Sequence, residues 1–137
     1  MERWLLDTNA LLSFFTDRNR SQQQSTLLLF QKALHGEMEL VLHQHVISEM
    51  VFTFLNVYRV EKTRTAEVLK DLIEHPGVVL LNEIRWGTVL NLWPSAFPDF
   101  GDSIVASVAR QNKYPVFTFD KAFGRQLTLS KIGWANP

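Results

Sequence analysis

The chain has 137 residues, of which 46% are hydrophobic and 20% charged, so we expect one folded domain over residues 1–137 and not a disordered chain. It has no cysteine, which excludes disulfides and thiolate metal sites, and its apolar runs are too short for a signal peptide or a membrane span, so a cytoplasmic location is expected. Its 14 basic and 14 acidic residues balance, so binding of any nucleic acid would require basic groups gathered locally or supplied by a second subunit.

The hydrophobic pattern predicts strands that alternate with helices along almost the whole chain. Short apolar runs indicate buried parallel strands, and apolar residues three or four apart indicate amphipathic helices. In chain order, the predicted elements are a strand at 4–6, helices at 8–15 and 22–34, a strand at 40–42, helices at 46–58 and 62–74, a strand at 78–81, helices at 83–93 and 103–111, a strand at 116–119, a helix at 121–127 and an edge strand within 129–137. Ser21 and Asn82 are the predicted N-caps of the second and fifth helices. This alternation is the signature of an α/β sheet built from crossover units.

Four acidic residues occupy positions that could converge. Asp7 and Asp120 follow predicted strands, Asp102 stands at the start of a predicted helix, and Glu49 lies inside the apolar segment 46–58. Open α/β folds place their sites at the carboxyl edge of the sheet, where such residues meet. Carboxylates gathered in one pocket repel each other unless hard cations lie between them, which suggests a Mg²⁺ or Mn²⁺ site.

Each of these acids also has an ordinary structural explanation. Asp7, Asp99 and Asp120 precede predicted helices, where Asp is a favoured N-cap, and Asp102 could complete a capping-box-like turn with Asp99. Glu49 has no capping role, so it either points to solvent beside the apolar stripe or belongs to a site, because an unpaired buried carboxylate is costly. Capping suffices for each aspartate taken singly, and the joint pattern favours a site.

Polar and basic residues accompany the acids. Hydroxyl and amide groups can orient carboxylates and metal-bound water, and the candidates are Thr8, Asn9, Ser103 and Thr118. Basic residues on predicted loops or helix starts near Asp7 and Asp120 could hold RNA phosphates at the rim of the pocket. These are Arg18, Arg20, Lys121 and Arg125. Each of the four, taken alone, is otherwise an ordinary solvated surface charge.

Together these residues carry a resemblance to the PIN domain, and more narrowly to the VapC-type toxin ribonucleases. The matching segments, in family order, are 6–9 (LDTN), 48–49 (SE), 99–109 (DFGDSIVASVA) and 117–123 (FTFDKAF). No single motif is specific, but the ordered set is, and it covers essentially the whole chain. The resemblance implies one PIN-like nuclease domain, a three-layer α/β/α sandwich around a central, mostly parallel sheet.

The resemblance also implies what the site does. The acidic quartet of a metal-dependent endoribonuclease would be Asp7, Glu49, Asp102 and Asp120, with Asp7 and Asp102 as the main ligands of Mg²⁺ or Mn²⁺. Asp99 resembles an additional acid of some members, Ser103 stands where many relatives have Ala, and Thr118 matches the small hydroxyl residue before the last acid. A homodimer is implied, and the toxin branch implies a cognate antitoxin; for the dimer, we expect apolar side chains left uncovered on 52–58 or 62–74.

Other functions remain open from the sequence. The chain could be a PIN nuclease of RNA processing instead of a toxin. It could also be a non-catalytic RNA-binding or interaction module with the same fold, although the complete quartet argues against this. Two other aspartate-based phosphoryl-transfer classes fit poorly. The haloacid dehalogenase type requires an acid at position 9, which is Asn here. The response-receiver type requires a lysine at the end of its last strand, whereas Lys121 follows an acid.

Overall fold

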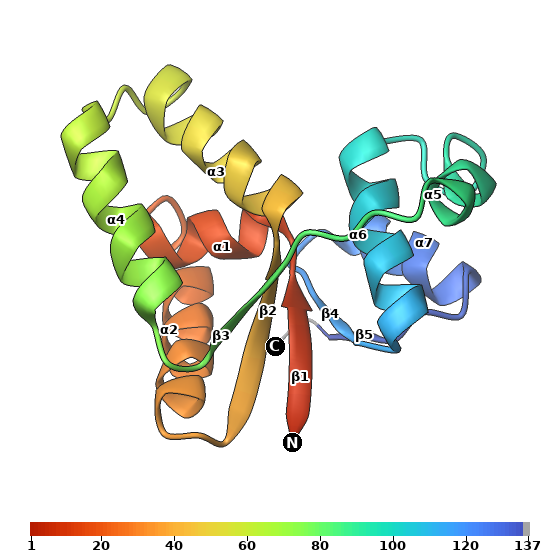
Figure 1. Cartoon of the computed structure of the whole chain (residues 1–137), viewed down its shortest axis with the longest axis horizontal. Helices are drawn as coiled ribbons and strands as arrows, with labels where there is room; N and C mark the ends of the chain where they lie inside the picture. Colours follow the sequence, from red (N-terminus) through yellow and green to blue (C-terminus); the bar gives the residue numbers. More distant parts are fainter. Residues whose placement is uncertain (136–137) are drawn as a thin grey trace.

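The computed structural model describes residues 1–135 as a five-stranded sheet with helices on both faces (Figure 1). The elements are β1 (Glu2–Leu6), α1 (Thr8–Phe15), α2 (Arg20–Leu34), β2 (Met38–His43), α3 (Gln44–Asn56), α4 (Lys62–Glu74), β3 (Val78–Leu81), α5 (Trp86–Leu92), α6 (Phe100–Asn112), β4 (Val116–Phe117), α7 (Lys121–Leu129) and β5 (Trp134–Ala135). The predicted three-layer α/β/α architecture is confirmed, including the edge strand near the end of the chain. None of the helices in residues 1–135 combines the length and apolarity needed to cross a membrane.

The strand order explains where a site can form. The strands lie in the order β3-β2-β1-β4-β5, and all neighbours are parallel. The chain first moves outward from β1 to β3, and then crosses back to β4 on the other side of β1. Because crossovers between parallel strands are right-handed, α1–α4 cover one face of the sheet and α5–α7 the other (Figure 1). The reversal leaves a crevice at the carboxyl ends of β1 and β4, where ligands bind in folds of this kind.

The central strands are buried on both faces, as strands of a parallel sheet covered by helices must be. Leu5 and Leu6 of β1 have no exposed surface, and the same holds for Leu40, Val41 and Leu42 of β2. This is why the strands read as continuous apolar runs and not as alternating patterns. The core therefore fixes β1 rigidly, and the residues that follow β1 leave the sheet from a defined point.

Several element boundaries lie one to three residues from their predicted positions, among them the start of α2, the start of α5 and the end of β4. The N-cap of α2 is Asn19, not Ser21: Asn19 accepts a hydrogen bond from the amide of Gln22 at 3.1 Å. Asn and Ser cap equally well, so the spacing could not choose between them. Helix α5 begins at Trp86, not after Asn82, because the chain leaving β3 must first cross to the other face of the sheet. Strand β4 ends at Phe117, and the next two residues turn toward α7.

Candidate active site

Asp7 and Thr118 meet at the crevice between β1 and β4. Leu6 pairs with Phe117 in the sheet register, so the residues that follow them leave neighbouring strands side by side. Thr118 donates its hydroxyl to Asp7 Oδ2 at 2.5 Å, and the Ala10 amide donates to Asp7 Oδ1 at 2.8 Å. Asp7 is only 6% exposed. The carboxyl group therefore caps α1 with one oxygen, and Thr118, the residue after β4, fixes the other.

Five carboxylates gather around this point. A cleft at the carboxyl edge of the sheet is lined by four of them, Asp7, Glu49, Asp99 and Asp102. The fifth, Asp120, lines an adjoining hollow, which shares Asn9 with the cleft. The pKa of Asp102 is raised to about 7. Burial is the largest cause, and the negative charges of four acids add to it, namely Asp99, Asp7, Asp120 and Glu49. The other three acids of the predicted quartet are thus all close enough to Asp102 to raise its pKa.

The pKa of Asp7 is also raised, to about 6. Burial is the largest cause, and the charge of Asp120 adds to it. The hydrogen bonds from Thr118 and Ala10 work in the opposite direction, because they stabilise the carboxylate. Asp7 and Asp102 therefore share an environment that disfavours two negative charges, and a cation between them would relieve it.

Glu49 is held from two sides. The hydroxyl of Thr8 donates to Glu49 Oε1 at 2.6 Å. His45 Nε2 lies 3.2 Å from the same oxygen, close enough for an ion pair but without the alignment of a hydrogen bond. This contact raises the pKa of His45 and lowers the pKa of Glu49. Glu49 is half exposed on its helix, as expected for a residue beside the apolar stripe, and it faces the cleft.

Sequence reasoning missed His45. The signal was present, because His45 precedes Glu49 by four residues and such pairs face the same side of a helix. His43, two residues earlier, has a structural role: its Nδ1 accepts from the His45 amide at 3.0 Å and caps α3. Gly101 also belongs to the pocket, since a Cβ there would lie 3.0 Å from His45 Nε2 and 3.2 Å from Asp99 Oδ1.

The residues expected to support the acids differ in what they contact. Thr8 and Thr118 each donate to an acid, as described above. Asp99 lines the cleft and caps α6 by accepting from the Asp102 amide at 2.9 Å. Ser103 is buried, and its hydroxyl donates to the carbonyl of Phe100 in its own helix at 2.5 Å, so its bond goes to the backbone and not to an acid. Asn9 lines the cleft, and its carbonyl accepts a bond from Arg18.

Of the four basic residues proposed for the rim, Arg18 is placed beside the acids. Its guanidinium donates to the Asn9 carbonyl at 2.9 Å, and it lines the same hollow as Asp120. Its positive charge lowers the pKa of Asp7, against the larger effect of burial. The other three side chains, Arg20, Lys121 and Arg125, are exposed.

The donor set suits a hard divalent cation. Carboxylate and hydroxyl oxygens are the ligands that Mg²⁺ and Mn²⁺ prefer, and the excess negative charge at Asp102 is what such an ion would neutralise. Within residues 1–135, no three acidic or histidine side chains are gathered closely enough to surround one ion. The chemistry of the pocket therefore fits a bound cation, which would have to draw the carboxylates together.

The hydrogen bond from Thr118 to Asp7 gives a testable prediction. Replacing Thr118 by Val keeps the shape but removes the donor, so the pKa of Asp7 should rise further above 6. Above that pKa, the free energy of unfolding should fall by about 1–3 kcal/mol, the usual cost of a lost hydrogen bond to a charged group. NMR titration and urea unfolding would measure the two effects. Thr118→Ser keeps the hydroxyl and is the control; equal behaviour of both variants would contradict the assignment.

The protein is thus an α/β fold with a parallel sheet, and its acid cleft lies where the strand order reverses, between β1 and β4. This cleft is a candidate metal centre. The sequence matches the PIN domain family over residues 4–126, and the chain belongs to that family. A comparison with curated proteins finds no match.

Solved structures show the same fold at low sequence identity. VapBC2 from Rickettsia felis, bound to a DNA fragment from its promoter, aligns with a TM-score of 0.70 at 14% identity and covers 98% of each chain. VapBC-1 from nontypeable Haemophilus influenzae gives 0.70 at 13% identity, covering 98% of this chain and 97% of that one. VapC20 of Mycobacterium tuberculosis, a sarcin-ricin loop cleaving toxin, gives 0.64 at 15% identity, covering 97% and 98%. Identities this low show the shared fold alone.

Proposed function

We propose that the protein is a metal-dependent endoribonuclease that hydrolyses RNA phosphodiester bonds. The observation that carries the proposal is the convergence of Asp7, Glu49, Asp102 and Asp120, expressed in the raised pKa of Asp102. Membership of the PIN domain family, whose members are typically ribonucleases, supports it. A bound Mg²⁺ or Mn²⁺ would supply a hydroxide nucleophile near neutral pH and neutralise charge on the phosphate.

Each acid has a role suited to its surroundings. Asp7 and Asp102 would hold the cation, because their charges are the ones that burial and like charges penalise most. Thr118 and the Ala10 amide fix the orientation of Asp7, as the partners of metal ligands commonly do. Glu49, oriented by Thr8 and His45, would accept the proton that the attacking water loses. Asp120, at the margin of the cleft, would orient that water or hold a second ion.

The partners of the protein are part of the same proposal. Two of the similar structures are VapBC complexes, in which a toxin of this fold is crystallised with its antitoxin. We propose that this chain is likewise a toxin with a small cognate antitoxin. A PIN nuclease of RNA processing would have the same site. Co-purification of the chain with the product of a neighbouring small gene, followed by inhibition of cleavage, would distinguish the two.

Calorimetric titration tests the proposed metal site without requiring the RNA target. Mn²⁺ added to the wild-type protein should give saturable binding with displacement of protons near pH 6.5, since the pKa values of Asp7 and Asp102 are about 6 and 7. Asp7→Asn should weaken this binding strongly. Asp71→Asn removes an exposed carboxylate on α4 and is the matched control. Identical titrations of the two variants would refute the metal role of Asp7.

RNA must be held by cations, because the cleft itself repels phosphates. We predict that Arg18→Glu together with Arg125→Glu weakens RNA binding and its dependence on salt, while Mn²⁺ binding stays nearly intact. Fluorescence anisotropy across a salt series would measure this, since each lost phosphate contact lowers the slope of log affinity against log salt by about 0.7 for single strands. Unchanged RNA affinity would place the binding surface elsewhere.

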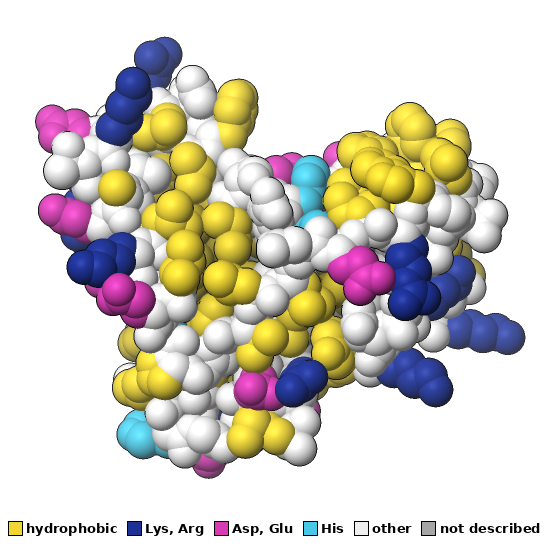
Figure 2. Space-filling model, viewed as in Figure 1, with side chains coloured by type: hydrophobic (Ala, Val, Ile, Leu, Met, Phe, Trp, Pro, Cys, Tyr) yellow, Lys and Arg dark blue, Asp and Glu magenta, His cyan; other side chains and the backbone are white. Residues whose placement is uncertain are grey.

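A homodimer is the second assembly that we propose. Phe52 and Val57 at the end of α3 are 64% and 62% exposed, and hydrophobic side chains form a band over α3 and α4 in Figure 2. Exposed apolar surface of this kind usually marks a partner site. We predict that Phe52→Glu converts a dimer to a monomer in analytical ultracentrifugation at micromolar concentration. Leu129→Glu, on exposed α7, should leave the dimer intact; a monomeric wild-type protein would contradict the prediction.

A further inference from the structure

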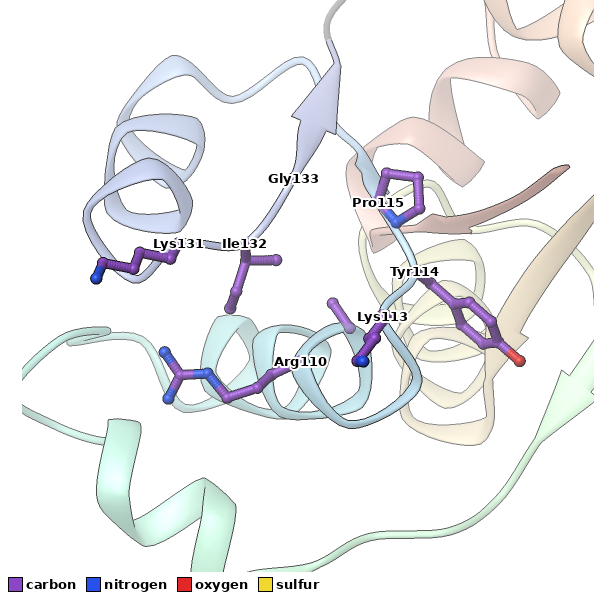
Figure 3. A pocket seen from close by; sticks show the side chains of 8 residues that line it. Arg110, Lys113, Tyr114, Pro115, Lys131, Ile132 and Gly133 are labelled. Atoms are coloured by element: carbon purple, nitrogen blue, oxygen red, sulfur yellow. The ribbon is translucent and has the colours of Figure 1, made fainter.

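A second cleft lies at the amino ends of β4 and β5, whereas the acids lie at the carboxyl edge of the sheet. It has a volume of about 400 Å³ and opens between the end of α6, the segment entering β4 and the turn from α7 to β5 (Figure 3). Three basic residues line it, Arg110, Lys113 and Lys131, and none of its lining residues is acidic. Lys and Arg side chains also gather in Figure 2 over the end of the molecule formed by α6 and α7. The acid cleft and this basic cleft thus have opposite charge.

Both lysines occupy backbone positions that favour glycine. Lys113 is the C-cap of α6 with φ 58°, and Lys131 follows the C-cap of α7 with φ 60°. A Cβ is strained in this left-handed region, which is why helices commonly end there on glycine. Only three non-glycine residues of segment 1–135 have positive φ, and two of them line this cleft. Both strained positions lie at one hollow, and backbone strain of this kind is common where a protein binds a ligand.

The positive charges of the cleft are available for binding. The ion pairs within residues 1–135 use Arg3, Arg64, Arg85 and His45, so the three cleft cations form none. Arg110 donates one amino group to the Ser130 carbonyl at 2.7 Å, which orients the guanidinium and leaves its other donors free. The helix dipole also favours cations near the C-terminal end of a helix. That effect accounts for one basic residue at the end of α6 and one at the end of α7, but not for three that line one hollow.

We propose that this basic cleft binds a phosphate group of the RNA that the acid cleft cleaves, an inference that rests on the proposed function. Helix α6 connects the two sites, with Asp102 in its first turn and Lys113 at its end. The eleven residue steps from Asp102 to Lys113 span about 16 Å, or roughly five nucleotides at a stacked rise of 3.4 Å. A remote cationic anchor is what a protein of zero net charge with an acidic cleft needs to retain a polyanion.

The test uses RNA binding in an Asp7→Asn background, so that binding is measured without cleavage. The probe is a fluorescein-labelled, single-stranded RNA of mixed sequence, followed by anisotropy over a salt series. Lys113→Gln with Lys131→Gln should weaken binding about tenfold and lower the salt slope by about 0.7, the loss of one phosphate contact. Lys62→Gln with Lys70→Gln removes the same charge from exposed positions on α4 and should leave both values unchanged.

Glycine variants separate a binding role from a structural one. Lys113→Gly with Lys131→Gly should lose RNA affinity as the glutamine pair does, while the melting temperature holds or rises by a few degrees, because glycine suits positive φ. A fall in melting temperature with unchanged affinity would mean that the lysines only stabilise the helix ends, and would overturn the proposal.

The remaining outcomes are also decisive. Unchanged affinity and slope in the glutamine pair, an equal loss in the α4 control pair, or no RNA binding by the background protein would overturn the proposal. A duplex DNA probe distinguishes the source of the phosphate: a loss confined to DNA contradicts RNA anchoring, and a loss confined to RNA or shared by both supports it. Failure of the nuclease function itself would appear separately, as a wild-type protein that binds no Mn²⁺ and cleaves no RNA.

Discussion

Replacing Asp7 by Asn is expected to lower the rate of RNA cleavage more than about 100-fold, because losing even a supporting partner of a metal ligand costs about 10- to 100-fold. The protein should remain folded. Asn caps helices as well as Asp does, so the hydrogen bond from the Ala10 amide can persist. The substitution therefore removes the charge and keeps the cap, which separates the two roles of this residue. Single-turnover cleavage assays with Mg²⁺ would measure the rate.

Asp71→Asn is the control for that experiment, since it removes an exposed carboxylate far along the chain on α4 and should not change the rate. Far-UV circular dichroism and thermal unfolding would verify the fold of both variants. If Asp7→Asn unfolds the protein, capping is the main role of Asp7. If the folded variant cleaves RNA at the wild-type rate, Asp7 holds no catalytic cation.

Asp102→Asn is expected to stabilise the metal-free protein, and more so as the pH rises. Burial and the surrounding acids raise the pKa of Asp102 to about 7, from a usual value near 4. The variant should gain about 1–3 kcal/mol in free energy of unfolding at pH 8 relative to pH 5, a range reduced because Asp102 is partly exposed. Urea unfolding in EDTA at the two pH values would measure the gain.

The direction follows from proton binding. With a folded-state pKa above the unfolded one, the folded protein holds the proton more tightly between about pH 4 and pH 7. The associated stability is fully present below the unfolded value and is lost as the pH rises through the folded one. The variant cannot titrate, so it escapes this loss. Mg²⁺ should make the wild-type protein the more stable of the two, because the ion would bind and stabilise only the wild type. A variant less stable than wild type at pH 8 in EDTA would contradict the prediction.

Much of the fold could be predicted because its strands are buried on both faces and its helices are amphipathic. The apolar run before Asp7 and the periodic segment 62–74 were each placed correctly. The observed boundaries that differ from the predicted ones depend on interactions that the sequence pattern does not reveal. Asn19 and Ser21 are equally good caps, and the start of α5 is set by the path across the sheet edge, where His43 contacts the Glu83 carbonyl at 2.9 Å.

The acids could be predicted because parallel strands bring their carboxyl ends to one edge. What the sequence does not provide is the sheet register, which makes Thr118 a neighbour of Asp7 although 111 positions separate them. Helical spacing alone predicts that His45 and Glu49, four residues apart, face the same side of α3. The basic cleft was not accessible, because Lys113 and Lys131 are joined only by the packing of α6 against the turn before β5.

The central claim, that Asp7 and Asp102 hold a catalytic divalent cation, is tested most directly by anomalous diffraction from crystals soaked in Mn²⁺. We expect an anomalous peak in the acid cleft with both carboxylates as ligands, and no peak there in crystals of Asp7→Asn. A wild-type cleft without a peak at saturating Mn²⁺, or a peak that Asp7 and Asp102 do not touch, would contradict it.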